Sequence, residues 1–147
     1  MNTKMTCSRF FVLVGMVLFP AAHMYAQAGG YKVVVNPSNT LTSISKAELA
    51  RIFTKKSTQF SGGSKASPVD LPVKSSARDS FSKSVLGKPA AAMDSYWQQQ
   101  IFSGKDVPPP IRDEDAAISF VRSSANGIAY VSATADTAGL NVITVAE

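Results

Sequence analysis

The chain has 147 residues, with 15 lysines and arginines, 10 acidic residues and a formal net charge of +5 at pH 7. This length fits one domain of ordinary size. The positive charge is too small and too evenly spread to indicate a nucleic-acid-binding protein.

The first 28 residues have the pattern of a secretory signal peptide. Lys4 and Arg9 precede an apolar run at 10–19, and small residues follow with the spacing of a cleavage site. We expect cleavage after Ala28, with Ala26 as the alternative, and therefore an exported, periplasmic domain at 29–147. The apolar run is shorter than the about 20 residues of a membrane span, so we expect no stable span after cleavage.

Signal cleavage would limit the chemistry of the mature chain. The only cysteine and the only histidine, Cys7 and His23, lie in the segment to be removed, which excludes a Ser-His-Asp arrangement. A Ser-Lys pair stays open, but Ser45 in "SISK" serves better as a helix cap. The acidic run 113–115 fits the start of a helix better than a metal site. We expect no enzyme activity, no metal and no cofactor.

The mature region begins with a strand and a helix. The β-branched residues at 31–36 predict a strand that ends at Asn-Pro. Ser45 and Glu48 have the spacing of a capping box, and the helix that follows carries an apolar stripe of Leu49, Ile52 and Phe53.

The next segment is a polar, glycine-rich loop at 58–67 followed by a second strand at 68–74. Pro72 lacks a backbone donor, so this strand is expected at the edge of a sheet or to be irregular there.

Helices dominate the rest of the chain. The pattern predicts, in order, a helix at 77–86 stopped by Gly87, a helix beginning at Pro89, a helix at 113–124, and strands at 127–131 and 140–145. In the helix after Pro89, Met93, Trp97 and Ile101 share helical spacing. A platform for ligands at Tyr96-Trp97 is one reading, and core packing is the favoured one.

Alternating strands and helices predict an α/β fold with a mostly parallel mixed sheet flanked by helices. Ligands of open sheets of this kind bind beyond the carboxyl ends of the strands. The stretch "KSSARD", at 74–79, lies at one such end.

This stretch has two readings. As a structural feature, Ser75 or Ser76 caps the helix that follows, and Arg78 pairs with Asp79 or with solvent. In the second reading the stretch is an oxyanion site. Lys74 supplies positive charge, and the two serines and the backbone amides at the helix start supply hydrogen-bond donors. The planar guanidinium fork of Arg78 binds two oxygens of the anion, and Asp79 orients Arg78.

The order of motifs resembles the phosphate-binding protein family of the phosphate ABC transporters. The resemblance rests on "YKVVVNPSN", "ISKAELARIFTKK", "LPVKSSARDSFSKSVLG", "ISFVRSSANGIAYVS" and "GLNVITV" and covers the whole mature chain. It implies a periplasmic-binding-protein fold, of which this chain has the length of one lobe. In that family a basic residue and a Ser-Gly-Thr run open the anion loop, and here Ala77 replaces the expected glycine or threonine.

The resemblance implies a function and leaves an alternative open. The first reading is an exported module that recognises phosphate or a similar oxyanion, weakly, and is linked to phosphate transport. The second is a periplasmic interaction or scaffold protein that kept the lobe without its ligand. In that reading, the loop 58–67 and the segment 108–110 are candidate contacts, and a protein partner or a second copy of the chain supplies the other lobe.

Overall fold

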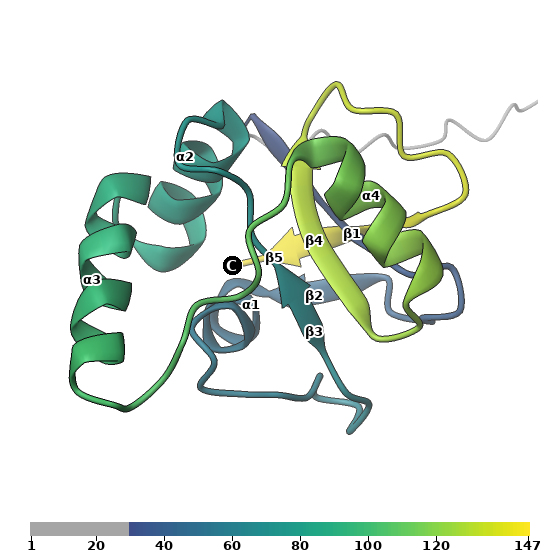
Figure 1. Cartoon of the computed structure of the whole chain (residues 1–147). Helices are drawn as coiled ribbons and strands as arrows, with labels where there is room; N and C mark the ends of the chain where they lie inside the picture. The colour runs from purple at the N-terminus through teal and green to yellow at the C-terminus, as the bar shows by residue number, and fades with distance from the viewer. Residues whose placement is uncertain (1–29) are drawn as a thin grey trace, which may run out of the picture.

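The computed structural model describes residues 30–147, so the expected signal segment 1–28 lies outside the described residues. Strands and helices alternate along most of this range (Figure 1). In chain order they are β1 (Tyr31–Val35), β2 (Ser43–Ser45), α1 (Lys46–Phe53), β3 (Ser67–Val69), α2 (Ser76–Phe81), the π-helix η1 (Ser82–Leu86), α3 (Ala90–Phe102), α4 (Glu114–Ser123), β4 (Gly127–Ser132) and β5 (Asn141–Ala146).

The strands form one mixed sheet in the order β2-β5-β1-β4-β3. The outer pairs, β2 with β5 and β3 with β4, are parallel, whereas β1 runs antiparallel to both β4 and β5. The mixed α/β fold is as predicted, but parallel pairs do not predominate. The apolar pattern locates a strand without giving its direction, and the reversed direction of β1 makes both central pairs antiparallel.

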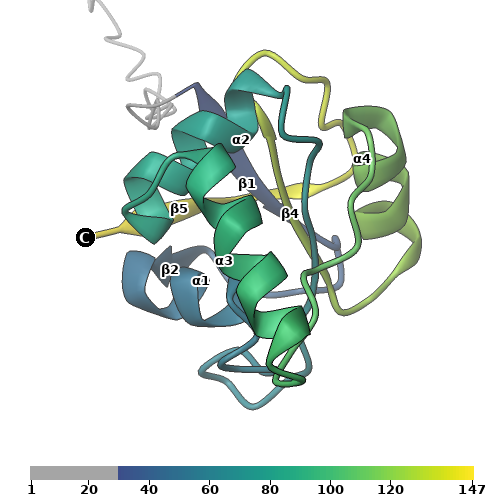
Figure 2. The same cartoon turned by 60° about the vertical axis from the view of Figure 1, so that its left-hand side comes forward.

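The central strands are buried on both faces. Val33, Val34 and Val35 are fully buried, although successive side chains of a strand point to opposite faces. The helices account for this, because α4 covers one face of β1 and β4 while α2 covers the other, and α1 contacts β2 and β3 (Figure 1). Figure 2 shows α3 on the outside of this second layer, and η1 is the element that α3 mainly contacts.

The start of α1 confirms half of the predicted capping box. The Ser45 hydroxyl accepts a hydrogen bond from the backbone N–H of Glu48 at 3.1 Å. The Glu48 carboxylate instead accepts from the backbone N–H and the hydroxyl of Ser61, at 2.6 and 2.8 Å. Glu48 therefore anchors the loop after α1 rather than completing the cap.

The second strand is shorter than predicted, because β3 ends at Val69. It does lie at the edge of the sheet, as expected. Beyond it, Asp70 forms an isolated bridge with Ile111, and Pro72 lies outside the strand.

The predicted helix at 77–86 consists of α2 and η1, and Gly87 ends it with a left-handed φ of 69°, as predicted. In α3, Met93 and Trp97 are buried, which confirms that the tryptophan is packed and is not an exposed platform. The prediction is wrong for Ile101, which is 52% exposed. Ile101 lies in the last turn of α3, and Figure 1 shows that this end of the helix extends beyond η1.

Gly127, at the start of β4, is a position where a side chain would not fit. A Cβ there would lie 2.9 Å from Val121 Cα and 3.0 Å from the Ser124 carbonyl oxygen, both backbone atoms. We predict that Gly127→Ala lowers the free energy of unfolding by about 1–3 kcal/mol, the usual cost of overpacking. Gly62→Ala is the control, because no atom lies within 4 Å of its Cβ position. Urea unfolding measures both, and equal stabilities would contradict the prediction.

Candidate functional site

The predicted oxyanion stretch lies at the start of α2. Ser75 is the N-cap, and its hydroxyl accepts a hydrogen bond from the backbone N–H of Arg78 at 3.3 Å. The N–H of Ser75 itself donates to the Pro72 carbonyl at 2.9 Å. The capping role predicted for this serine pair is therefore confirmed for Ser75.

Lys74 and Ser76 flank this cap and face solvent. Both residues are exposed, whereas Ser75 is half-buried. Among residues 30–147, neither side chain makes a hydrogen bond or an ion pair. An ammonium and a hydroxyl are thus accessible at the start of a helix, where the backbone dipole favours negative charge.

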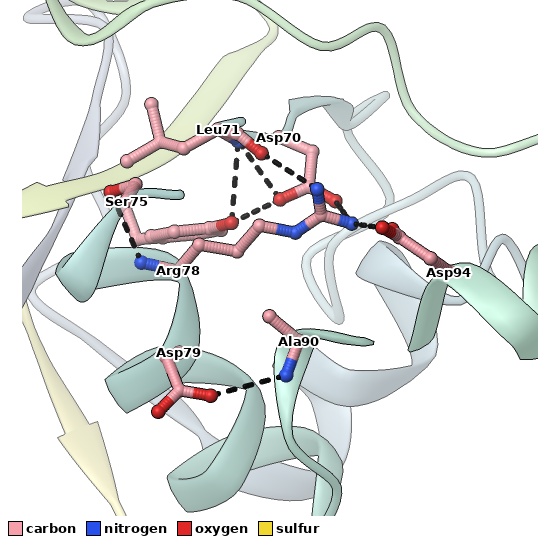
Figure 3. Close-up of polar contacts among 8 residues, drawn as sticks. Asp70, Leu71, Ser75, Arg78, Asp79, Ala90 and Asp94 are labelled. Atoms are coloured by element: carbon pink, nitrogen blue, oxygen red, sulfur yellow. Dashed lines mark hydrogen bonds and ion pairs between the residues drawn. The ribbon is translucent and has the colours of Figure 1, made fainter. Parts of the chain in front are cut away.

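Arg78, by contrast, is buried, with 2% of its surface exposed. Its Nη1 donates to the Leu71 carbonyl at 3.0 Å, and its Nη2 donates to Asp94 Oδ1 at 2.7 Å (Figure 3). Asp70 Oδ2 lies 3.3 Å from the same nitrogen. The fork expected to face an external anion is therefore engaged with two carboxylates of the protein itself.

Asp70 is the buried partner of this arginine. Its Oδ1 accepts hydrogen bonds from the Tyr130 hydroxyl and, at 2.9 Å, from the backbone N–H of Leu71. Burial raises the pKa of the Asp70 carboxyl, and the hydrogen bond from Tyr130 and the charge of Arg78 oppose this rise. Burial also raises the pKa of the Tyr130 hydroxyl, so the tyrosine stays protonated and donates to the carboxylate.

Tyr130 also packs against two phenylalanine rings, one from α1 and one from α2. Its ring stacks on Phe81 with centroids 3.9 Å apart, and Phe53 packs against both rings at 4.8 and 5.5 Å. The polar network around Arg78 is therefore connected, through Tyr130, to three aromatic rings that pack against one another.

Asp79 does not orient Arg78, contrary to the expectation from sequence. One carboxylate oxygen pairs with Lys83 at 2.6 Å. The other accepts a hydrogen bond from the backbone N–H of Ala90 at 3.3 Å (Figure 3). The hydrogen bond from Lys83 and the one from Ala90 lower the pKa of Asp79. Asp79 thus links α2 to the start of α3.

Sequence reasoning missed Asp70, Asp94 and Tyr130. Asp94 is 16 residues from Arg78, and Tyr130 is 60 residues from Asp70. The only local signal was an arginine on the apolar side of a predicted helix, next to Ala77 and Phe81, which are also buried. A buried arginine requires acidic partners, but its position alone does not identify them.

The other candidate residues have structural partners. Asp113 caps α4 by accepting from the backbone N–H of Ala116 at 2.8 Å, and Glu114 accepts from the N–H and hydroxyl of Ser132. Over the described range there is no group of three potential metal ligands, and no helix is long and apolar enough to cross a membrane. A surface hollow of about 390 Å³ lies beside α1, lined by Glu48, Arg51 and Phe60 among others.

The architecture is similar to that of solved phosphate ABC transporter proteins, which supports at the level of the fold the resemblance seen in the sequence. The described residues have the fold of one periplasmic-binding-protein-like lobe. No family model and no curated protein matches the chain.

Three solved structures illustrate this likeness. An ABC-type phosphate transport receptor from Vibrio cholerae superposes with a TM-score of 0.57 at 18% identity, over 80% of this chain and 46% of the receptor. PstS from Borrelia burgdorferi superposes with a TM-score of 0.58 at 15% identity, over 80% of this chain and 47% of PstS. The third structure is a phosphate ABC transporter substrate-binding protein from Clostridium perfringens with bound phosphate. It superposes with a TM-score of 0.59 at 20% identity, over 80% of this chain and 45% of that protein. The chain therefore matches less than half of each neighbour's length.

The buried ion pairs give a prediction about stability. Replacing Arg78 by methionine leaves Asp70 buried without its cation, so we expect Arg78→Met to lower the free energy of unfolding by about 3–5 kcal/mol at neutral pH. Arg51→Met, at an exposed site on α1, is the control and should change stability by less than about 0.5 kcal/mol.

The same variant has an expected pH dependence. A folded pKa raised above the unfolded one favours folding at low pH, and this contribution is lost as pH rises through the folded pKa. Without Arg78 the pKa of Asp70 rises further, because an opposing charge is removed. The stability gap between wild type and Arg78→Met should therefore be smaller at about pH 4 than at about pH 7. Urea unfolding at both values tests this, and a gap that widens on acidification would contradict it.

Proposed function

We propose that residues 29–147 form an exported, periplasmic module that binds phosphate or a similar oxyanion and acts in connection with a phosphate ABC transporter. The observation that carries this proposal is the pair of exposed side chains, Lys74 and Ser76, at the start of a helix just beyond β3, in a lobe with the fold of phosphate-transport proteins. Those neighbours are substrate-binding proteins, which favours binding over catalysis.

The proposed ligand contacts divide into two groups. Lys74, Ser75 and Ser76, together with the first backbone amides of α2, provide outward donors to the anion. Arg78 adds a second cation when one of its own carboxylate partners gives way, and Asp79 supports the site by holding α2 against α3 through Ala90. Ala77, in place of a glycine or threonine, leaves this loop with one hydroxyl donor fewer.

The affinity should be low. A single face leaves the anion partly hydrated, and charge contacts are weak where the effective dielectric is high. We expect a Kd of about 0.1–10 mM, as suits a few exposed charge-assisted contacts.

Amide chemical shifts test the proposal directly. In about 20 mM phosphate, above the expected Kd, the backbone amides of Ser75, Ser76 and Arg78 should shift at constant ionic strength. Lys74→Ala should weaken the response severalfold, since it removes a charge-assisted contact. Lys105→Ala, which removes the same charge from the exposed loop after α3, is the control. Unmoved amides at the start of α2 would end the proposal.

A second candidate function is supported by exposed apolar side chains near the end of α3. Ile101 and Phe102 of α3 are 52% and 92% exposed, and Val107 in the segment that follows is 60% exposed. Neighbouring exposed apolar residues are typical of protein contact sites. The chain matches less than half of the length of its structural neighbours, and the proposed contact is with a partner protein or a second copy of the chain.

Sedimentation distinguishes this interaction role. If the chain self-associates through this region, Phe102→Ser should lower the weight-average mass at a concentration where wild type is oligomeric, because the most exposed apolar ring is lost. Val142→Ser, at a 50% exposed position on β5, is the matched control. A wild-type chain that stays monomeric at all concentrations would exclude self-association and leave only a different partner.

A further inference from the structure

The Arg78 guanidinium already holds oxyanions, although they belong to the protein. Asp94 Oδ1 is 2.7 Å from Nη2, and Asp70 Oδ2 is 3.3 Å from the same nitrogen (Figure 3). A carboxylate and a phosphate oxygen bind a guanidinium through the same charge-assisted hydrogen bonds. An external anion that reaches Arg78 must therefore compete with these side chains.

The two carboxylates differ in how easily they can be displaced. Asp70 is only 12% exposed and is held further by Tyr130 and by the N–H of Leu71. Asp94 is 40% exposed, and the pair with Arg78 is the one polar contact of its side chain in the described part of the chain. Asp94 is the partner that an anion from solvent would replace.

The guanidinium also has an unused donor. Arg78 Nε is buried and has no hydrogen-bond partner within residues 30–147. Nε–H and one N–H of Nη2 lie along the same edge of the planar group, the edge that binds two oxygens of one anion. Because Nε is unpaired, that edge is at most half occupied, and an anion with several oxygens would use both donors.

The helix that carries Asp94 is attached outside the main core. Ala90, Met93 and Trp97 of α3 are buried, but they do not belong to the continuous core cluster that joins the sheet, α1, α2 and α4. Figures 1 and 2 show α3 on the outside, beside η1. Movement of α3 would therefore leave the packed centre of the lobe closed.

We propose that Asp94 is an internal competitor of the anion: it closes the Arg78 fork while α3 is docked, and phosphate or sulfate occupies the fork as α3 moves away. This inference rests on the proposed oxyanion binding and adds its regulation. Because coupling between two equilibria is reciprocal, the bound anion loosens α3 to the same extent that docked α3 weakens the anion.

Asp94→Asn is the decisive variant. The asparagine oxygen still accepts from Arg78 Nη2, but the competing negative charge is gone, so phosphate should bind about tenfold more tightly than to wild type. Asp115→Asn, an exposed acidic position in α4, changes net charge equally and should leave the affinity unchanged. Calorimetry with inorganic phosphate, and separately with sulfate, at constant ionic strength gives the three affinities.

The outcomes separate the two proposals. If Asp94→Asn and Asp115→Asn bind phosphate with the wild-type affinity, the competitor role is overturned while oxyanion binding stands. If none of the three proteins binds phosphate or sulfate, oxyanion binding itself fails and the competitor role with it.

Hydrogen exchange of the wild-type chain provides a readout that does not depend on any variant folding. Saturating phosphate should speed exchange of the α3 amides and change the fluorescence of Trp97, the single tryptophan of the chain, while the amides of β1 and β4 stay protected. Unchanged exchange in α3 on a phosphate-saturated protein would overturn the inference.

Discussion

A buried arginine is the constraint on which the arrangement around the start of α2 depends. Taking a guanidinium out of water costs several kcal/mol unless opposite charges and hydrogen bonds offset it. Arg78 of α2 receives that compensation from Asp70 and Leu71, just after β3, and from Asp94 of α3. Tyr130 extends the network to β4. One side chain thus joins two strands to two helices and fixes where the exposed start of α2 lies.

The features that could be predicted from sequence are those decided by residues close together in the chain. Ser45, Ser75 and Asp113 were each expected at the start of a helix, and each caps one, because a cap needs only a side-chain oxygen and an amide two or three residues later. Gly87 ends its helix for an equally local reason, its left-handed backbone. The apolar strands and the order of elements were predictable on the same basis.

The features that could not be predicted depend on tertiary contacts. The carboxylate partners of Arg78 lie 8 and 16 residues away and outside its own helix, so the choice between solvent, Asp79 and an external oxyanion was open until the helices were placed in space. The direction of β1 is likewise set by its neighbours in the sheet. Glu48 had the right spacing for a capping box, yet Ser61, 13 residues later, provides its partners. Arg78 and Glu48 each had a plausible partner within their own helix, and each binds a residue outside it.

The edge strands of the sheet affect whether a strand from another protein chain can pair with it. Both edge strands, β2 and β3, have three residues, and β3 contains Pro68, which has no backbone donor. Beyond β3 the edge is continued by hydrogen bonds of Asp70 with Pro110 and Arg112. Short, proline-bearing and covered edges oppose the addition of a strand from another chain. The edge at β3 therefore disfavours backbone pairing with a strand of another chain, the kind of pairing that leads to fibrils.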